Sequence, residues 1–274
     1  MNKILQIASS RRTWAWPYVL FMLLFVVLPL LLVGVYAFTD IEGHFTLRNF
    51  AKFFTHSEAI QTFLYSLMIA VFNTAICLLI GYPAAYFMAA EDFKTPKVMA
   101  MLFILPMWIN FLLRTVATVE LFNIFGLPLG EGALLFGLCY DYLPFMIYPI
   151  YNTLQKMDTS LVEAAQDLGA NRWVCFWKVI VPLSMPGVYS GIVMVFMPTV
   201  STFAIAELLT HNNIKLFGSL IQDYITTTDL LNYGAVLSLV LLIIMSISWL
   251  LKNTLLNLLW NCCQTIQPLR CVAT

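Results

Sequence analysis

Long apolar stretches constrain this chain more than any other feature of its sequence. A helix needs about 20 apolar residues to cross roughly 30 Å of hydrocarbon. Six stretches reach that length: residues 17–38, 61–90, 98–119, 132–152, 186–206 and 231–251. Only 10% of the residues are charged and 61% are hydrophobic, which is too little charge to cover the surface of a soluble domain. The sequence therefore predicts an all-α membrane protein of six transmembrane helices.

Basic residues in the flanks of these stretches predict the orientation of the chain. The first stretch is longer than the apolar core of a signal peptide and lacks a small-residue cleavage site, so we expect it to be retained. With the N-terminus inside, the inner segments hold ten basic residues: Lys3, Arg11, Arg12, Lys94, Lys97, Lys156, Arg172, Lys178, Lys252 and Arg270. The outer segments hold three: Arg48, Lys52 and Lys215. We expect a cytoplasmic N-terminus at 1–16, a membrane domain at 17–255, and a cytoplasmic tail at 256–274.

The cysteines predict neither a disulfide framework nor a metal site. There are six of them, and none forms a C-x-x-C pair: Cys77, Cys139, Cys175, Cys262, Cys263 and Cys271. Three lie in apolar stretches, where a thiol acts as a small apolar side chain. We expect no metal and no catalytic cysteine in this chain.

The connection from residue 153 to residue 185 has the pattern of structured chain. Ser160 and Glu163 have the spacing of a capping box, which starts a helix. Apolar residues follow at helical spacing, and Gly169 is placed to end the helix in a left-handed conformation. This part of the connection predicts a short helix.

A second short helix is predicted directly after it. Asn171 can cap this helix, and its apolar face carries aromatic residues that suit the headgroup region. That face comprises Trp173, Phe176, Trp177 and Ile180. Pro182 and Pro186 are expected to close the helix. The connection thus predicts two short helices, joined at a glycine, beneath the membrane.

The first of these helices carries a pattern suited to contact with another protein. Ala164, Ala165 and Gly169 leave its face bare, so that a partner can approach the backbone closely. Glu163 and Asp167, one turn apart, offer charge-assisted contacts to basic groups of that partner. An ordinary amphipathic interfacial helix is the alternative interpretation.

Segment 158–186 resembles the EAA loop of ABC importer permeases, E-A-A-x-x-x-G-x(9)-I-x-L-P, with Val181 where leucine is usual. The resemblance implies that a separate ATPase docks on this loop. The chain contains no Walker A sequence, so we expect ATP and Mg to be used by that partner and no cofactor to be bound here.

Further runs resemble one branch of these permeases. Residues 105–114, 140–146, 163–182 and 203–209 are similar to the first permease subunit of spermidine/putrescine importers. The resemblance implies the type I ABC importer (MetI-like) permease fold and import of polyamines across a bacterial inner membrane. It also implies three kinds of partner: a homologous second permease subunit, an ATPase dimer and an extracytoplasmic polyamine-binding protein. The tail from residue 261 onward departs from this pattern.

Two ionisable residues fall inside predicted spans. A charged side chain at membrane depth costs free energy, so such a residue is by default a candidate for a functional role. Arg114 lies in the third stretch and Asp141 in the fourth, at depths that differ by about 6 Å, which an arginine can bridge. One interpretation is a structural ion pair that joins the two spans. The other is that Asp141 meets a cationic substrate while Arg114 gates the path.

A polyamine path needs carboxylates and aromatic faces for its ammonium groups. Trp108, Tyr140, Tyr142 and Tyr148 lie near Asp141 in the sequence or in depth. Glu207 lies at the outer end of the fifth stretch. These residues are the candidate substrate path, although aromatic residues in membrane helices also serve as packing or belt residues.

Other functional classes remain open at this point. The same kind of permease could carry an amino acid, iron, thiamine or an opine. An intramembrane aspartyl protease would use Tyr140–Asp141 but needs a second aspartate in another span, which the stretches lack. A passive scaffold would have no use for the EAA helix.

Overall fold

The computed structural model describes residues 11–40, 42–55, 57–89, 103, 105–227, 230–248 and 250, with residues 11–15 described by backbone alone. These residues are mostly helical, and the β-pairing recorded among them is one isolated bridge between Thr39 and Phe45. Five of the described helices are long and apolar enough to cross a bilayer: Trp16–Ala37, Ser57–Ala89, Glu131–Gln155, Arg172–Ser201 and Leu231–Ser248. They confirm five of the six predicted stretches. The predicted tail at 256–274, Lys94 and Lys97 lie outside the described residues.

The chain divides into two compact units, residues 1–60 with 221–243 and residues 61–220 with 244–274. In the first unit, α2 (Arg11–Met22), the π-turn η1 (Leu23–Val27) and α3 (Leu28–Ala37) follow one another without a break. The carbonyl of Thr39, just after α3, accepts hydrogen bonds from two asparagine side chains. Asn49 of α4 (Arg48–Thr55) donates over 3.0 Å, and Asn232 of the last span donates over 2.6 Å. These bonds hold the end of the first span, α4 and the start of the last span together.

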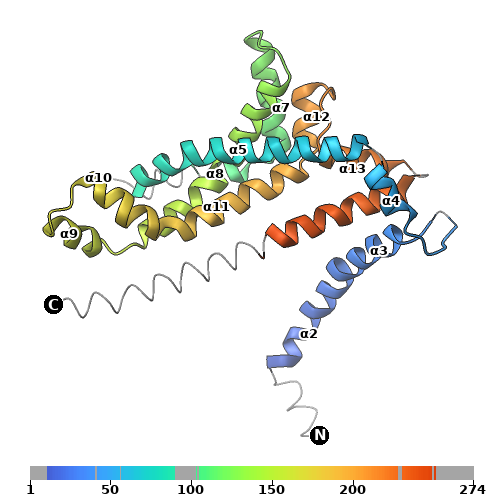
Figure 1. Ribbon diagram of the computed structural model, residues 1–274, viewed down its shortest axis with the longest axis horizontal. Helices are drawn as coiled ribbons and strands as arrows, with labels where there is room; N and C mark the ends of the chain where they lie inside the picture. The colour runs from blue at the N-terminus through green and yellow to red at the C-terminus, as the bar shows by residue number, and fades with distance from the viewer. Residues whose placement is uncertain are drawn as a thin grey trace, which may run out of the picture. The chain divides into compact units, whose positions relative to one another are not determined.

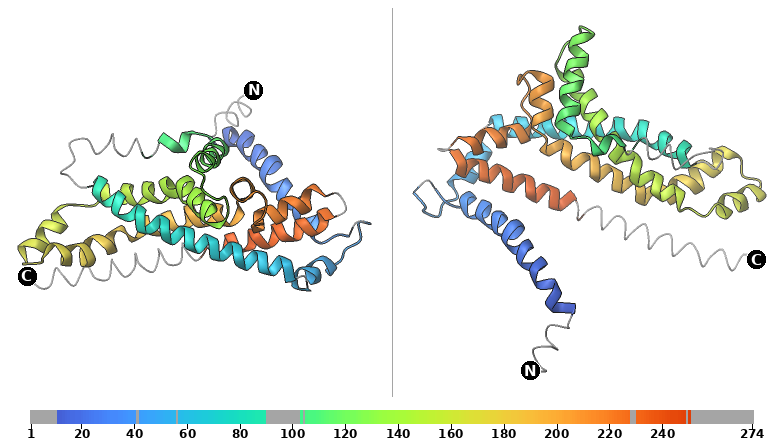
Figure 2. Two further views of the ribbon diagram at one scale, coloured as in Figure 1. Left: turned by 90° about the horizontal axis from the view of Figure 1, so that it is seen from above. Right: turned by 180° about the vertical axis from the view of Figure 1, so that it is seen from behind.

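The second unit is built on three long helices that run side by side, α5 (Ser57–Ala89), α8 (Glu131–Gln155) and α11 (Val181–Ser201) (Figures 1 and 2). Their shared core contains fully buried side chains from each helix, among them Cys77, Met146 and Val195. A second cluster joins α8 to α12 (Ala204–Thr210) through residues such as Leu138 and Leu209. The same unit contains α7 (Phe111–Ile124), α9 (Ser160–Asp167) and α10 (Arg172–Cys175), whereas α13 (Phe217–Thr226) includes residues of both units.

Small residues bring α11 and α8 close together. Gly187 and Gly191 have the G-x-x-x-G spacing that lets membrane helices approach at backbone distance. A Cβ atom on Gly187 would lie 2.8 Å from the carbonyl oxygen of Pro149, and one on Gly191 would lie 3.1 Å from that of Met146. No larger residue fits at either position without moving one helix away from the other.

The third predicted stretch, 98–119, is not a single helix where the structure describes it. A 3-10 turn, η2 (Leu105–Trp108), is followed by two non-helical residues before α7 begins at Phe111. Asn110 has an extended backbone and its side chain accepts the Leu112 N–H at 2.9 Å, so it caps α7. α7 then continues beyond the predicted end to Ile124. The apolar composition predicted one continuous helix, but Pro106 and the cap at Asn110 interrupt it.

The second cytoplasmic helix and the fifth span also differ from the prediction. α10 (Arg172–Cys175), the π-turn η3 (Phe176–Ile180) and α11 form one continuous helix from Arg172 to Ser201. Pro182 and Pro186 therefore do not close a short helix, and the span ends at Ser201 rather than at residue 206. The wider π-turn just before Pro182 makes room for a ring that would clash with a regular preceding turn. η1 precedes Pro29 in the same way.

Replacing Gly187 with alanine tests the close packing of α8 and α11. The added methyl group meets a backbone carbonyl that cannot rotate away, so we expect the variant to lose about 1–3 kcal/mol of stability. Gly132→Ala is the matched control, because a Cβ on Gly132 meets nothing within 4 Å. The measurement is thermal unfolding of the detergent-purified protein. Equal melting temperatures for both variants would contradict this packing.

Candidate functional site

A cavity of about 670 Å³ lies in the second unit, where two helices break. One wall is the segment before and at the start of α7, and another is the end of α11 with the link to α12. Its lining residues are Met107, Trp108, Ile109, Asn110, Phe111, Arg114, Tyr142, Phe145, Pro198, Ser201, Thr202, Phe203 and Ala204. Five of them are aromatic, and Arg114 is the one charged residue among them.

Side chains donate hydrogen bonds to backbone carbonyls at the end of α11 beside the cavity. α11 ends at Ser201, where Thr202 turns to an extended backbone with ψ of 143°. The hydroxyl of Tyr142 donates to the carbonyl of Pro198 over 3.5 Å, and that of Ser201 donates to the carbonyl of Met197 over 3.2 Å. Irregular backbone at membrane depth is tolerated only where protein or water satisfies it, as it is around this cavity.

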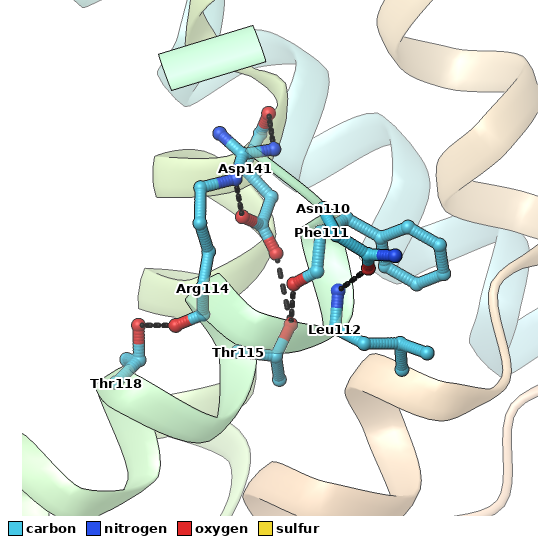
Figure 3. Close-up of polar contacts among 7 residues, drawn as sticks. All are labelled: Asn110, Phe111, Leu112, Arg114, Thr115, Thr118 and Asp141. Carbon is cyan, nitrogen blue, oxygen red and sulfur yellow. Dashed lines mark hydrogen bonds and ion pairs between the residues drawn. The ribbon is translucent and has the colours of Figure 1, made fainter. Parts of the chain in front are cut away.

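Arg114 and Asp141 form a buried ion pair beside the cavity (Figure 3). The Nε of Arg114 lies 3.2 Å from Oδ1 of Asp141, and the side chains are 6% and 2% exposed. The hydroxyl of Thr115 donates to Oδ2 over 3.1 Å, and Nη2 of Arg114 reaches the Asp141 carbonyl over 3.5 Å. This contact is the structural ion pair between α7 and α8 that one interpretation of the sequence expected.

The ion pair leaves part of its hydrogen-bonding capacity unused. Nη1 of Arg114 is buried and has no hydrogen-bond partner among the described residues, and the contact between Nε and Oδ1 lacks hydrogen-bond geometry. Arg114 lines the cavity, whereas Asp141 does not. The carboxylate therefore lies behind the guanidinium, and Asp141 can meet a ligand in the cavity only after the pair separates.

The other predicted path residues divide into two groups. Trp108 and Tyr142 line the cavity, and Trp108 is 88% exposed. Tyr140 lies outside it, with its ring 5.8 Å from the Arg114 guanidinium. Tyr148 and Glu207 do not line it either, and Glu207 is half-buried in the first turn of α12.

Sequence reasoning missed several residues of the cavity. Asn110, Phe145 and the link from Ser201 to Phe203 all line it. The signal for Asn110 was its capping chemistry inside an apolar stretch shortly after Pro106. Pro198 and the hydroxyl residues Ser201 and Thr202 were the signal for the link, but the predicted span 186–206 ran through them.

The predicted coupling helix is present as α9 (Ser160–Asp167), and its end has the expected geometry. Gly169 is left-handed, with φ of +81°. The N–H of Ala170 donates to the carbonyl of Ala165 over 3.0 Å, and that of Gly169 donates to Gln166 over 2.8 Å. These two bonds make a Schellman motif, which requires a residue that tolerates positive φ.

The start of α9 differs from the predicted capping box. Asp158, rather than Ser160, supplies the capping side chain, and its Oδ1 accepts the N–H of Ser160 over 3.1 Å. Thr159 is the residue just before the helix and makes no side-chain cap. The helix was predicted correctly, whereas its cap was placed two residues too late.

The face of this coupling segment (residues 158–171) is open. Glu163, Ala164, Asp167 and Gly169 are exposed, Ala165 is half-buried, and Leu168 is 89% exposed. Exposed apolar and acidic groups on a short capped helix are suited to contact with another protein. A membrane protein with several spans, a cavity at helix breaks and such a segment has the architecture of a transport permease.

Comparison with known proteins identifies the class. Residues 79–259 match the family described as binding-protein-dependent transport system inner membrane component. The chain belongs to this family of ABC importer permeases.

Individual relatives agree with this assignment. The chain is 32% identical over 249 residues to the spermidine/putrescine transport system permease protein PotB of Haemophilus influenzae, covering 82% of this chain and 87% of that protein. It is equally identical to PotB of Escherichia coli K12, covering 90% of that protein. PotC of the same organism, also a spermidine/putrescine permease, is 30% identical over 167 residues, which cover 61% of this chain.

Solved structures share the fold at low sequence identity. A bacterial alginate ABC transporter matches with a TM-score of 0.66 and 14% identity, over 89% of this chain and 92% of that one. The MetNI methionine ABC transporter, in inward-facing conformations, matches with a TM-score of 0.62 and 16% identity, over 73% and 95%. The MetI-like permease fold implied by the sequence is thereby confirmed.

A double-mutant cycle tests how the ion pair holds α7 to α8. Arg114→Met leaves the Asp141 carboxylate buried without its partner, and we expect it to lower stability by about 3–5 kcal/mol. Arg114→Met combined with Asp141→Leu removes both charges and should recover most of that loss. Thermal unfolding of the purified proteins measures both effects. Purely additive losses would show that the two side chains do not interact.

Proposed function

We propose that this chain is the permease subunit that carries polyamines, spermidine or putrescine, through an ATP-driven importer. The aromatic cavity is the observation that carries the proposal. The similarity to spermidine/putrescine permeases over most of the chain supports it independently.

The chemistry of the cavity suits a polyamine. Such a cargo has ammonium groups on apolar spacers, and the faces of aromatic rings attract ammonium groups electrostatically. Trp108, Tyr142 and Phe203 offer such faces, and the spacers can contact Phe111 and Phe145. A cavity of this kind holds the cargo weakly enough to release it.

The ion pair supplies a gate in this scheme. While Arg114 holds Asp141, the charge that the cavity meets is a guanidinium, which repels a cation. When the pair opens, the carboxylate becomes available to the cargo. Tyr140, Tyr148 and Glu207 would then line parts of the substrate path that lie outside this cavity.

The coupling segment would pass the work of ATP hydrolysis to the cavity. The helix that starts at Arg172, directly after this segment, continues without a break to Ser201 at the cavity. Its 30 residues amount to about 45 Å at 1.5 Å per residue. A push on Glu163–Gly169 by a docked ATPase can therefore displace one wall of the cavity directly.

The proposal includes further parts of the importer. A homologous second permease completes the pathway, and an ATPase dimer binds ATP and Mg on the inner side. A polyamine-binding protein delivers the cargo outside. Both termini then lie in the cytoplasm, as the distribution of basic residues predicts.

Two substitutions at Gly169 test the coupling role. Gly169→Val cannot adopt positive φ without strain, so the end of α9 is disturbed, whereas Gly169→Asn tolerates this conformation. In the reconstituted importer we expect the valine variant to lose most of the ATPase stimulation by loaded binding protein, and the asparagine variant to keep it. Full stimulation and uptake with valine would count against the assignment of this segment.

Uptake of labelled spermidine tests the cargo path. Trp108→Leu removes an exposed ring that could contribute about 0.5–2 kcal/mol of cation–π attraction, so we expect KM to rise between about 2-fold and 30-fold. Asp141→Asn and Glu207→Gln should also reduce uptake. Asp158→Asn is the control, because asparagine caps α9 as well as aspartate does.

The outcomes of the uptake assay distinguish an error in the proposed path from an error in the identity of the cargo. If all four variants behave alike, the proposed path is wrong. If an amino acid, iron, thiamine or an opine were taken up and a polyamine were not, the assignment as a permease would stand and the assignment of its cargo would change.

A further inference from the structure

A second cavity, of about 290 Å³, lies between the end of α5 and the start of the long helix at Arg172. The residues that line this groove are Tyr82, Pro83, Tyr86, Phe87, Arg172, Trp173 and Phe176. Phe176 packs edge-on against the rings of Tyr82 and Tyr86, at 6.0 and 5.2 Å between centroids, so the floor of the groove is built of interlocked aromatic rings. Phe87 and Trp173 are exposed at its sides.

The groove continues an apolar stripe on α5. Leu79, Pro83 and Phe87 are all exposed and follow one another at four-residue spacing, which places them on one side of the helix. Tyr82 lies seven residues, or about 10 Å, from the end of α5 at Ala89. The groove thus lies near the end of a spanning helix and opens along its apolar surface. Trp173 and Tyr86 have the amphipathic rings that prefer this depth of a bilayer.

Among the described residues that line the groove, Arg172 is the charged one. No ion pair of Arg172 with an acidic side chain is recorded in the part of the chain that the structure describes. An exposed guanidinium beside an aromatic groove suits a molecule with an anionic head and an apolar chain.

We propose that this groove binds an anionic phospholipid, with its phosphate at Arg172 and part of one acyl chain against the aromatic floor. The phosphate accepts hydrogen bonds from the guanidinium fork. The acyl chain continues along the stripe of α5, where a bilayer already supplies such chains. The bound lipid would support the junction between the coupling segment and the long helix.

Two other occupants fit the same observations less well. A free phosphate would contact Arg172 but leave the aromatic walls unused. A docked ATPase segment would bury the exposed aromatic rings, but among the described lining residues it would find a single charge, Arg172, to pair with. The lipid uses both the charge and the walls.

Native mass spectrometry of the detergent-purified importer tests the proposal with dioleoylphosphatidylglycerol as the probe. We expect this lipid to bind in preference to phosphatidylcholine. Arg172→Gln should weaken its binding about fivefold, the effect of one basic residue worth about 1 kcal/mol at a lipid surface. Lys178→Gln is the matched control, because Lys178 is an exposed cation of the same helix that does not line the groove, and it should leave binding unchanged.

A photoreactive benzoylphenylalanine in place of Phe87 then identifies the occupant in membranes. We expect its adducts to be phospholipid. An adduct with an ATPase or a second permease would overturn the proposal, as would equal weakening by both glutamine variants or displacement of the lipid by inorganic phosphate. These measurements require no transport, so their outcome is separate from that of the polyamine proposal.

Discussion

Hydrocarbon offers no hydrogen bonds to a backbone, and this constraint shapes the protein. Five spans are continuous helices, and side chains bond to backbone groups at the described breaks. Asn110 caps α7 through the N–H of Leu112, and the Tyr142 hydroxyl serves the carbonyl of Pro198. π-turns precede Pro29 and Pro182. Because the two breaks with exposed backbone, before α7 and after α11, occur together in space, they open one cavity, and the polar groups that repair them become part of its lining.

Close packing and polar contacts hold the helices of this protein together, because lipid supplies no hydrophobic force between them. In a bilayer, close approach at small residues replaces the burial that drives association in water. Gly187 and Gly191 hold α11 against the backbone of α8, while a partly satisfied ion pair holds α7 to α8. The first contact is rigid, because a carbonyl faces each glycine. The second joins two buried charges and leaves Nη1 of Arg114 without a hydrogen-bond partner among the described residues.

Much of this was predictable from local patterns. The spans follow from apolar length, α9 and its end follow from helix-forming residues and Gly169, and the reach of an arginine placed Arg114 near Asp141. The errors arose where two local rules compete. Pro182 was expected to end a helix, but a π-turn accommodates it. The apolar run at 98–119 was expected to continue, but Pro106 and Asn110 interrupt it. Composition predicts that a stretch is in the membrane, whereas caps and turns decide where its helices begin.

The amino-acid sequence by itself determined that the chain spans a membrane, that its coupling segment is a short helix ended by a left-handed glycine, and that it resembles importer permeases. Periodicity, propensity and motif spacing are local properties, and they suffice for these conclusions. Only the tertiary structure decided that Asp141 lies behind Arg114, that Trp108 and Tyr142 share a cavity while Tyr148 does not, and that one helix joins the coupling segment to that cavity. These facts depend on which residues distant in sequence meet after the helices pack, and no local pattern contains that information.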